Sequence, residues 1–300
     1  MSHFHRKPII VPTDFSIPAL QAVHIAKSIA EVETDITIVY VGHDYDLIAA
    51  PNIWGTDVPP PQNDKERQEA RLQIWANDNN LGDVKLQVRQ GDPGTEVCEL
   101  ATEIGCQLIV VPSHGRHGLQ RVLLGSVAER IIRHCHCSVL VLRRGNDTGS
   151  ILELPEHWCP KKRIVVPVEL SSSTEATLNV ALELVDDRPN IDVINVVPSF
   201  HDAILVGSTI ISDETRRDNR QETLERYLAE HGYSGMRAHT VTGDPGTEIA
   251  KYADDVHADL VVMPSHGYHG LHRLVLGSTT ERVIRHSNSP VLVLRRSDAE

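Results

Sequence analysis

The stretch VVPSHGRHGLQRVLLGSVAERI, residues 110–131, decides the fold prediction for this chain, because a close copy of it follows later. The copy, VVMPSHGYHGLHRLVLGSTTERV, occupies residues 261–283. The match runs without a gap from the GDPGTE motif at Gly91 and Gly243 to the VLVLRR segment that ends at Arg144 and Arg296. A repeat this long indicates two copies of a whole domain and not a solenoid of short units.

Further upstream, IIVPTDFS at residues 9–16 matches IVVPVELS at residues 164–171. We therefore predict a first domain over residues 1–145, a linker over residues 146–160 and a second domain over residues 161–300. The linker region contains glycines and prolines and shows no helical period, which is typical of a domain boundary.

Short apolar runs alternate with amphipathic segments along each copy. In the first copy we expect strands over residues 8–12, 35–42, 84–91, 107–112 and 138–144. We expect helices over residues 17–32, 64–78, 95–105 and 126–134, with Ser16 capping the first of them. Residues 43–61 form a variable stretch, and the second copy repeats the order of elements.

Strands that alternate with helices predict an α/β fold with a parallel sheet covered on both faces. Right-handed crossovers make each copy a doubly wound, five-stranded sandwich. Each copy also ends in an apolar strand, SVLVLRR or SPVLVLRR, which would be an open template at a sheet edge. We therefore expect two tandem sandwiches that pack as a pseudo-twofold pair through these strands.

The composition argues against several classes of protein. A net charge of -12 and only 4% aromatic residues disfavour a nucleic-acid binder, because phosphate backbones require clustered cations. We expect no membrane association, since no apolar run approaches the ~20 residues that span a bilayer and no polybasic segment is present. The N-terminal residues lack a secretory pattern, and the 5 cysteines are odd in number and scattered. We therefore expect a cytoplasmic protein without a disulfide framework.

The repeated loop has the features of an anion site. Gly115 and Gly118 allow backbone N–H groups to turn toward a ligand, and Gly125-Ser126 stand where a helix begins. The unpaired N–H groups and the dipole of a helix N-terminus favour phosphate. The alternative is that the glycines only permit a tight loop and that Ser126 only caps the helix. The presence of two copies favours phosphate binding.

Other polar residues near the loop have two interpretations each. Asp14, just after the first strand, would accept hydrogen bonds from a ribose or a base amine, or would cap the following helix with or instead of Ser16. The loop histidines, His114, His117, His266 and His269, either pack within the loop or titrate and modulate phosphate affinity. The HCHC segment at residues 134–137 reads HSNS in the second copy, so free thiols are favoured there over a zinc site and no metal site is expected.

These motifs resemble those of the universal stress protein family, over nearly the whole chain except residues 43–65, 198–212 and the linker. Family members that bind nucleotides carry Gly-x-x-Gly, nine residues and Gly-Ser/Thr. The resemblance implies an adenine-nucleotide alpha-hydrolase-like fold and a site for ATP with Mg²⁺. It places Asp14 and Val41 near adenosine, and Val111, Gly115, Gly125, Ser126 and Val127 near the phosphates. In the second copy the matching residues are Glu169, Val196, Met263, Gly267, Gly277, Ser278 and Thr279. Further candidate nucleotide-binding residues on the same loops are Pro12, Thr13, His114, Gly118, Pro167, His266 and Gly270.

Three residues depart from the family pattern. Pro112 and Pro264 replace the first glycine of the motif and bring no N–H, and Glu169 replaces the aspartate. The expected function is therefore ATP binding in stress response or signalling, through a change of shape or partner and with at most slow hydrolysis. The alternative is a scaffold with a relic pocket; a nucleotidyl-transfer enzyme would need basic or metal-binding residues that the motifs lack. Expected partners are an adenine nucleotide, an unidentified protein and a second copy of the chain.

Overall fold

The computed structural model describes residues 7–42, 64–113, 124–143, 163–185, 187–199, 204–206, 209–265 and 276–295. The first domain contains β1 (Ile9–Thr13), α1 (Ile17–Ile29), η1 (Glu33–Asp35), β2 (Ile36–Gly42), α2 (Asp64–Asp78), β3 (Lys85–Gln90), α3 (Pro93–Glu103), β4 (Leu108–Pro112), α4 (Ser126–His134) and β5 (Ser138–Leu142). The second domain contains β6 (Ile164–Pro167), α5 (Thr174–Leu184), η3 (Arg188–Asn190), β7 (Ile191–Val197), β8 (Ile204–Val206), β9 (Thr209–Ile211), α6 (Asp213–Glu230), β10 (Arg237–Thr242), α7 (Pro245–Asp255), β11 (Leu260–Pro264), α8 (Ser278–His286) and β12 (Val291–Leu294).

The observed elements follow the predicted order but differ in detail. The short 3-10 helices η1 and η3 were not predicted, and α3 begins at Pro93 and ends at Glu103 instead of running over residues 95–105. The first helix ends at Ile29 and is capped by Ala30, so it is shorter than expected. Residues 198–212 contain an antiparallel pair, β8 and β9, which the sequence did not predict and which forms a separate two-stranded sheet. The predicted linker lies outside the described residues.

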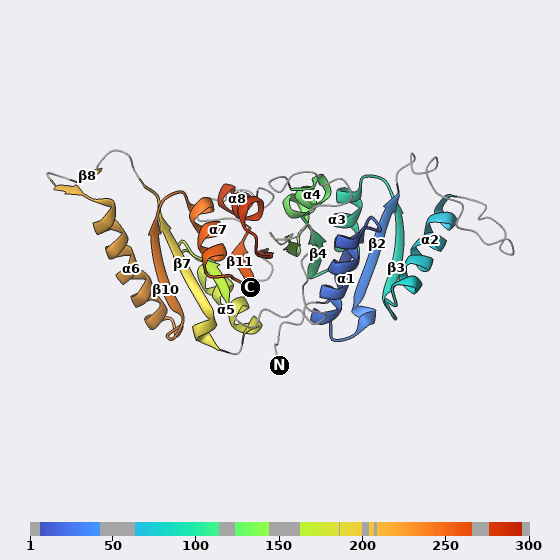
Figure 1. The fold of residues 1–300 in the computed structure, drawn as a ribbon, viewed down its shortest axis with the longest axis horizontal. Coiled ribbons are helices and arrows are strands. Elements are labelled where there is room, and N and C mark those ends of the chain that lie inside the picture. The colour runs from blue at the N-terminus through green and yellow to red at the C-terminus, as the bar shows by residue number, and fades with distance from the viewer. Residues whose placement is uncertain are drawn as a thin grey trace.

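All other strands form one ten-stranded sheet in the order β10-β7-β6-β11-β12-β5-β4-β1-β2-β3 (Figure 1). Within each domain the five strands are parallel, as the alternation of strands and helices predicted. The chain moves outward from β1 to β2 and β3, and then returns to the other side of β1 with β4 and β5. The topological switch point therefore lies between β1 and β4, and between β6 and β11 in the second domain.

The domains join through the two apolar strands that end each copy. β5 and β12 pair antiparallel, with Leu140 opposite Leu292 and Val139 opposite Val293. Leu140 and Leu292 are the same position of the repeat, so a pseudo-twofold axis passes between them. The predicted pairing is thus confirmed, and it removes both strands from the sheet edge.

Two apolar layers cover the sheet, and each continues through both domains. One layer lies under α1, α2, α5 and α6, and includes Ile38, Leu72, Leu178 and Leu224. The other lies under α3, α4, α7 and α8, and includes Val111, Ile131, Met263 and Ile284. In the part of the chain that the structure describes, no helix is both long and apolar enough to cross a membrane.

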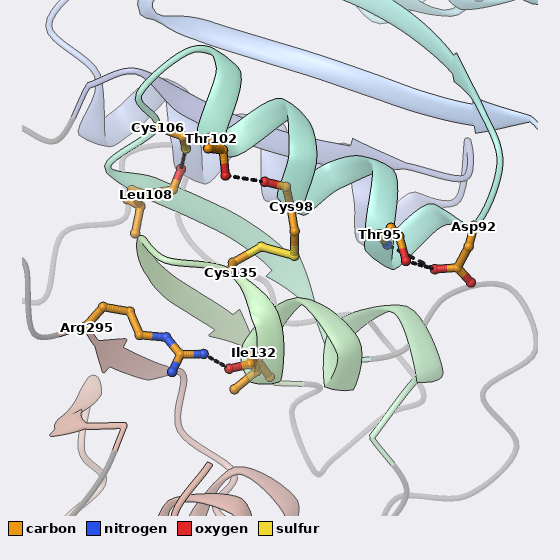
Figure 2. Close-up of a disulfide and its surroundings, with 9 residues drawn as sticks. All are labelled: Asp92, Thr95, Cys98, Thr102, Cys106, Leu108, Ile132, Cys135 and Arg295. Atoms are coloured by element: carbon orange, nitrogen blue, oxygen red, sulfur yellow. Dashed lines mark hydrogen bonds between the residues drawn. A yellow bond between two sulfur atoms is a disulfide. The ribbon is translucent and has the colours of Figure 1, made fainter. Parts of the chain in front are cut away.

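Two buried arginines fasten the domains together at this junction. The Nε of Arg143 donates to the carbonyl oxygen of Ser287 at 2.9 Å, and its Nη2 donates to that of Arg285 at 2.9 Å. At the related position, Nη2 of Arg295 donates to the carbonyl oxygen of Ile132 (Figure 2). Each guanidinium therefore supplies donors and positive charge to the C-terminal end of a helix in the other domain.

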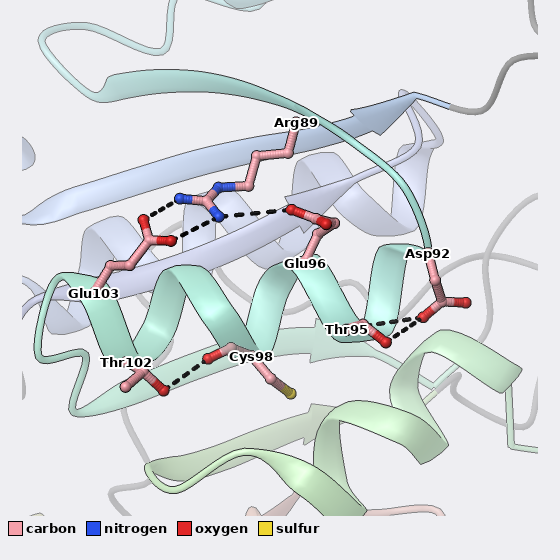
Figure 3. Close-up of polar contacts among 7 residues, drawn as sticks. All are labelled: Arg89, Asp92, Thr95, Glu96, Cys98, Thr102 and Glu103. Carbon is pink, nitrogen blue, oxygen red and sulfur yellow. Dashed lines mark hydrogen bonds and ion pairs between the residues drawn. The ribbon is translucent and has the colours of Figure 1, made fainter.

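The repeated GDPGTE motif docks α3 on α4. Asp92 is the N-cap of α3 and accepts from the Thr95 N–H at 2.9 Å (Figure 3). It also pairs with Arg130 of α4 at 2.5 Å. Gly94 faces the aliphatic part of Arg130 so closely that an added Cβ would stand 2.7 Å from the Arg130 Cβ. Gly246 and Arg282 repeat this contact in the second domain, at 2.6 Å.

We expect Gly94→Ala to destabilise the first domain, although alanine favours helices. The helix propensity gain is about 1 kcal/mol. The overlap with a Cβ that is fixed to a neighbouring helix forces α3 and α4 apart, which costs about 2–3 kcal/mol. Urea denaturation should therefore show a net loss of about 1–2 kcal/mol. A Gly94→Ala protein that unfolds at higher urea concentration than the parent would contradict the close packing.

Candidate functional site

The apolar residues of the candidate site meet at the carboxyl ends of the strands beside the switch point. Val41 of β2 and Val111 of β4 are buried in the same layer, together with Leu124 and Ala128 at the start of α4. Pro12 and Thr13 end β1, which lies between β2 and β4. The fold therefore brings these predicted residues to one edge of the sheet. Leu124 was missed, although its repeat, Leu276, marks the same place in the sequence.

The start of α4 presents backbone donors at this edge. Gly125 is the N-cap and makes no side-chain cap hydrogen bond. Ser126 is the first helical residue and is exposed, so the interpretation that Ser126 caps the helix is wrong. The first intrahelical bond runs from the Glu129 N–H to the Gly125 carbonyl oxygen at 2.8 Å. The N–H groups of residues 126–128 consequently have no acceptor within the helix.

Gly125 itself contributes space and not a donor. Its N–H donates to the carbonyl oxygen of Ser113 at 2.8 Å, and the Ser113 N–H donates to that of Leu142 at 2.8 Å. These two bonds close the base of the loop between β4 and α4. The expectation that the Gly125 backbone would donate to phosphate is therefore corrected: that role passes to the N–H groups that follow it.

The second domain repeats this arrangement. The Gly277 N–H donates to the Ser265 carbonyl oxygen at 2.9 Å, and α8 starts at Ser278 without a side-chain cap. Met263 is buried, Thr279 is partly buried and Ser278 is exposed. The Thr280 hydroxyl donates to the Pro264 carbonyl oxygen at 3.0 Å, so it serves the loop and is turned away from a ligand.

The carboxylate of Asp14 is held in a turn. Its Oδ1 accepts from the Ser16 N–H at 3.0 Å, while the Ser16 hydroxyl caps α1 by accepting from the Ala19 N–H at 3.4 Å. Phe15 between them has a left-handed backbone with φ 64°, and its N–H donates to the Thr13 hydroxyl. Ser16 is thus the N-cap of α1. The hydrogen bond from the Ser16 N–H holds the Asp14 carboxylate in the turn, at the edge of the sheet.

The matching turn in the second domain is built differently. Pro167 ends β6 and is buried, whereas the side chain of Glu169 is exposed. The N–H of Ser171, which corresponds to Ser16, donates to the Thr174 hydroxyl at 3.0 Å instead of to the acidic residue. Val196 of β7 is half-buried where Val41 is buried. The two candidate sites therefore differ most at the end expected to hold adenosine.

Several predicted residues lie outside the described residues. They are the loop residues His114, Gly115, His117, Gly118, His266, Gly267, His269 and Gly270. The structure fixes both ends of each loop, at Ser113 and Leu124 and at Ser265 and Leu276.

The cysteines correct the sequence prediction. Cys98 of α3 and Cys135, the C-cap of α4, form a disulfide (Figure 2). No disulfide was expected from the scattered cysteines, and the free-thiol interpretation of HCHC is therefore wrong for Cys135 but holds for Cys137. Cys106 and Cys137 are buried free thiols, and among the described residues no group of three metal-binding side chains comes together. A signal was present, because the second copy replaces both members of the pair, with Ala250 and Ser287.

Comparison with known proteins identifies the family. The sequence model of the universal stress protein family matches residues 5–143 and again residues 161–295, so this chain belongs to that family. Universal stress protein Rv2005c of Mycobacterium tuberculosis is 26% identical over 256 residues, which cover 82% of this chain and 81% of that protein. Universal stress protein MJ0531 of Methanocaldococcus jannaschii is 33% identical over 140 residues, 46% of this chain and 82% of that protein. A universal stress protein structure from Archaeoglobus fulgidus covers 100% of both chains with a TM-score of 0.64 and 20% identity, which shows the shared fold.

We expect the two sites to respond unequally to removal of their acidic residues. Asp14→Ala should weaken ATP binding at the first site by about 1 kcal/mol, or several-fold, because a fixed carboxylate loses its hydrogen bond to the ligand. Glu169→Ala should change the second site less, since the Glu169 side chain is exposed and the Ser171 N–H donates to the Thr174 hydroxyl. Calorimetric titration of each variant measures this difference. Asp14→Asn is the control, because it keeps an acceptor for the Ser16 N–H and so preserves the turn. An equal loss of ATP affinity at both sites in the two alanine variants would contradict the expected difference.

Proposed function

We propose that this chain binds adenine nucleotide, with ATP preferred, at the carboxyl edge of each half of the sheet. The observation that carries the proposal is the repeated geometry at the switch point: a helix begins there without a side-chain cap, directly after a glycine, in both domains. N–H groups at a helix N-terminus and its positive dipole end favour phosphate oxygens. The apolar residues Val41 and Val111 would cover the nucleoside.

Mg²⁺ would enter with the nucleotide and bind through its phosphates. The donor set at the first site fits this mode and not a protein cage, because the Asp14 carboxylate already accepts from the Ser16 N–H. A magnesium ion needs few protein ligands when phosphate oxygens and water complete its octahedron. The exposed hydroxyls of Ser126 and Ser278 stand closest to the helix starts and would contact the phosphates or this ion.

The proposed role is that of a nucleotide-dependent signalling protein in a stress response. Nucleotide would change the shape of α4 and α8 and thereby the choice of a protein partner. Hydrolysis would at most be slow, since Asp14, the acidic side chain at the first site, is engaged in its turn and not positioned to activate water. A cytoplasmic location and association with a second copy of the chain belong to the same proposal.

The second candidate is an interaction protein with a relic pocket. Two observations favour it: Pro112 and Pro264 bring no N–H to the loop, and the N–H groups of Gly125 and Gly277 donate within the protein. Each site would then rely on the three N–H groups that open its helix. Nucleotide released from the purified protein by denaturation, and identified by mass spectrometry, separates the two functions. An adenine nucleotide in stoichiometric amount is expected, and protein that carries none and gains none on incubation with ATP would favour the scaffold.

A further inference from the structure

The first domain holds a group of cysteines that the second domain lacks. Besides the disulfide between Cys98 and Cys135, the first domain contains the buried free thiols Cys106 and Cys137. The matching positions in the second domain are Ala250, Ser287, Ala258 and Ser289. The chain thus contains two versions of one structural unit, one with these cysteines and one without them.

The disulfide sits on the helix that opens the first candidate site. Cys135 directly follows α4 and its N–H donates to the Ile131 carbonyl oxygen at 2.9 Å. The bond ties this end of α4 to the middle of α3, 37 residues earlier in the chain (Figure 2). The other end of the same nine-residue helix carries Gly125 and Ser126. A restraint at Cys135 therefore acts on the helix that would hold phosphate.

The second domain shows that the fold does not need this bond. α7 and α8 dock through Asp244 and Arg282 and through the close approach of Gly246, as their counterparts do in the first domain. The residues that replace the cysteines there, Ala250 and Ser287, cannot form a covalent link. The disulfide is consequently an added restraint on a packing that forms without it.

The surroundings of the bond define how a thiol would reach it. Cys98 is partly exposed, whereas Cys135 is only 2% exposed, so Cys98 is the more accessible half of the bond for a nucleophile from solvent. Its hydrogen bond with Cys137, together with burial, raises the pKa of the Cys106 thiol far above its usual range. Cys106 also donates to the Leu108 carbonyl oxygen at 3.1 Å. It therefore remains a thiol at neutral pH and does not compete for the disulfide.

We propose that Cys98 and Cys135 form a reversible thiol–disulfide site, with a small thiol as its substrate, that controls the mobility of α4. The thiolate of one small thiol attacks the Cys98 sulfur, the bond to Cys135 breaks, and Cys135 leaves as a thiolate and takes up a proton. A second small thiol attacks the mixed disulfide at the small-molecule sulfur, which frees Cys98 and forms a small-molecule disulfide. Two electrons pass from the two small thiols to the protein. The expected consequence for ATP affinity rests on the proposed function, whereas the effect on α4 does not.

The test compares the full-length chain in oxidised and reduced glutathione by hydrogen exchange with mass spectrometry. Reduction should speed exchange of the amides of residues 126–134 by at least about threefold and leave those of residues 278–286 unchanged, because only the first helix loses a restraint. Cys98→Ser should reproduce the reduced pattern in both buffers. The double variant Ala250→Cys, Ser287→Cys should give residues 278–286 the same response, while residues 126–134 keep theirs.

Two results would overturn the proposal: free Cys98 and Cys135 after incubation with oxidised glutathione, or identical exchange of α4 in both states and in Cys98→Ser. ATP titration adds a second readout. Affinity at the first site should fall several-fold on reduction and that at the second site should stay constant, since a looser helix start must be ordered on binding. If ATP binds in neither state, the proposed nucleotide function fails, and the exchange of α4 alone decides the thiol site.

Discussion

The double variant Gly125→Val, Gly277→Val should lose ATP binding by about 100-fold or more, which is roughly 2.7 kcal/mol of binding free energy. Each glycine caps a helix whose first N–H groups would hold phosphate, so the two added methyl groups occupy the space of the phosphate oxygens. The backbone angles at these positions, φ -62° and ψ 143° at Gly125 and φ -64° and ψ 143° at Gly277, suit valine. The variant should therefore fold.

The matched controls are the single variants. Gly125→Val alone should remove the first site and Gly277→Val alone the second, so each should halve the ATP stoichiometry while the remaining site keeps its affinity. Circular dichroism and urea denaturation would establish that the fold survives, with a cost of about 1 kcal/mol or less for an inferior cap. Unchanged ATP affinity in the folded double variant would contradict the proposed phosphate position.

Replacing both buried arginines, in Arg143→Met, Arg295→Met, should lower the free energy of unfolding by about 4 kcal/mol. A charge-assisted hydrogen bond to a buried carbonyl contributes about 1.5–3 kcal/mol, and the carbonyl acceptors at Ser287, Arg285 and Ile132 remain after the arginines are removed. Two effects oppose this loss of stability: methionine restores part of the packing, and the variant no longer buries a charged guanidinium. We still expect a net loss of stability, because methionine cannot donate hydrogen bonds to the carbonyl groups at the helix ends.

Arg217→Met is the control for this experiment. The side chain of Arg217 on α6 is 43% exposed and pairs with Asp218 at 2.9 Å, and such surface pairs contribute about 0–1 kcal/mol. Urea denaturation of the three proteins compares the buried and exposed arginines directly. A double variant as stable as Arg217→Met would show that β5 and β12 hold the domains together without the arginines.

The fold could be predicted because hydrophobic periodicity is a local property of the sequence and because the repeat is visible when the two halves of the chain are compared. Apolar runs such as residues 107–112 and 138–144 predicted buried strands. The apolar strand that ends each copy indicated where the domains meet. Turn chemistry was partly readable, since Pro93 opens α3, although the helix was expected over residues 95–105 and its N-cap, Asp92, was not predicted. The β8–β9 pair was missed because residues 198–212 have no counterpart pattern in the first copy.

The site was predicted less completely, because hydrogen-bond partners depend on tertiary contacts. The sequence located the helix start at Ser126, but the Gly125 N–H donates to the carbonyl oxygen of Ser113, a partner that the pattern alone does not indicate. Asp14 had two interpretations, and the structure shows that its carboxylate belongs to the turn before α1. The pairing of Cys98 with Cys135 required the docking of α3 on α4, which spacing alone does not reveal.

Calorimetric titration of the unmodified chain with ATP in the presence of Mg²⁺ tests the central claim most directly. We predict saturable binding at two sites, with tighter binding at the first, weaker binding of ATP when Mg²⁺ is withheld, and weaker binding of GTP under the same conditions. Absence of saturable heat for ATP up to about 1 mM, which corresponds to about 4 kcal/mol of binding free energy, would contradict nucleotide binding.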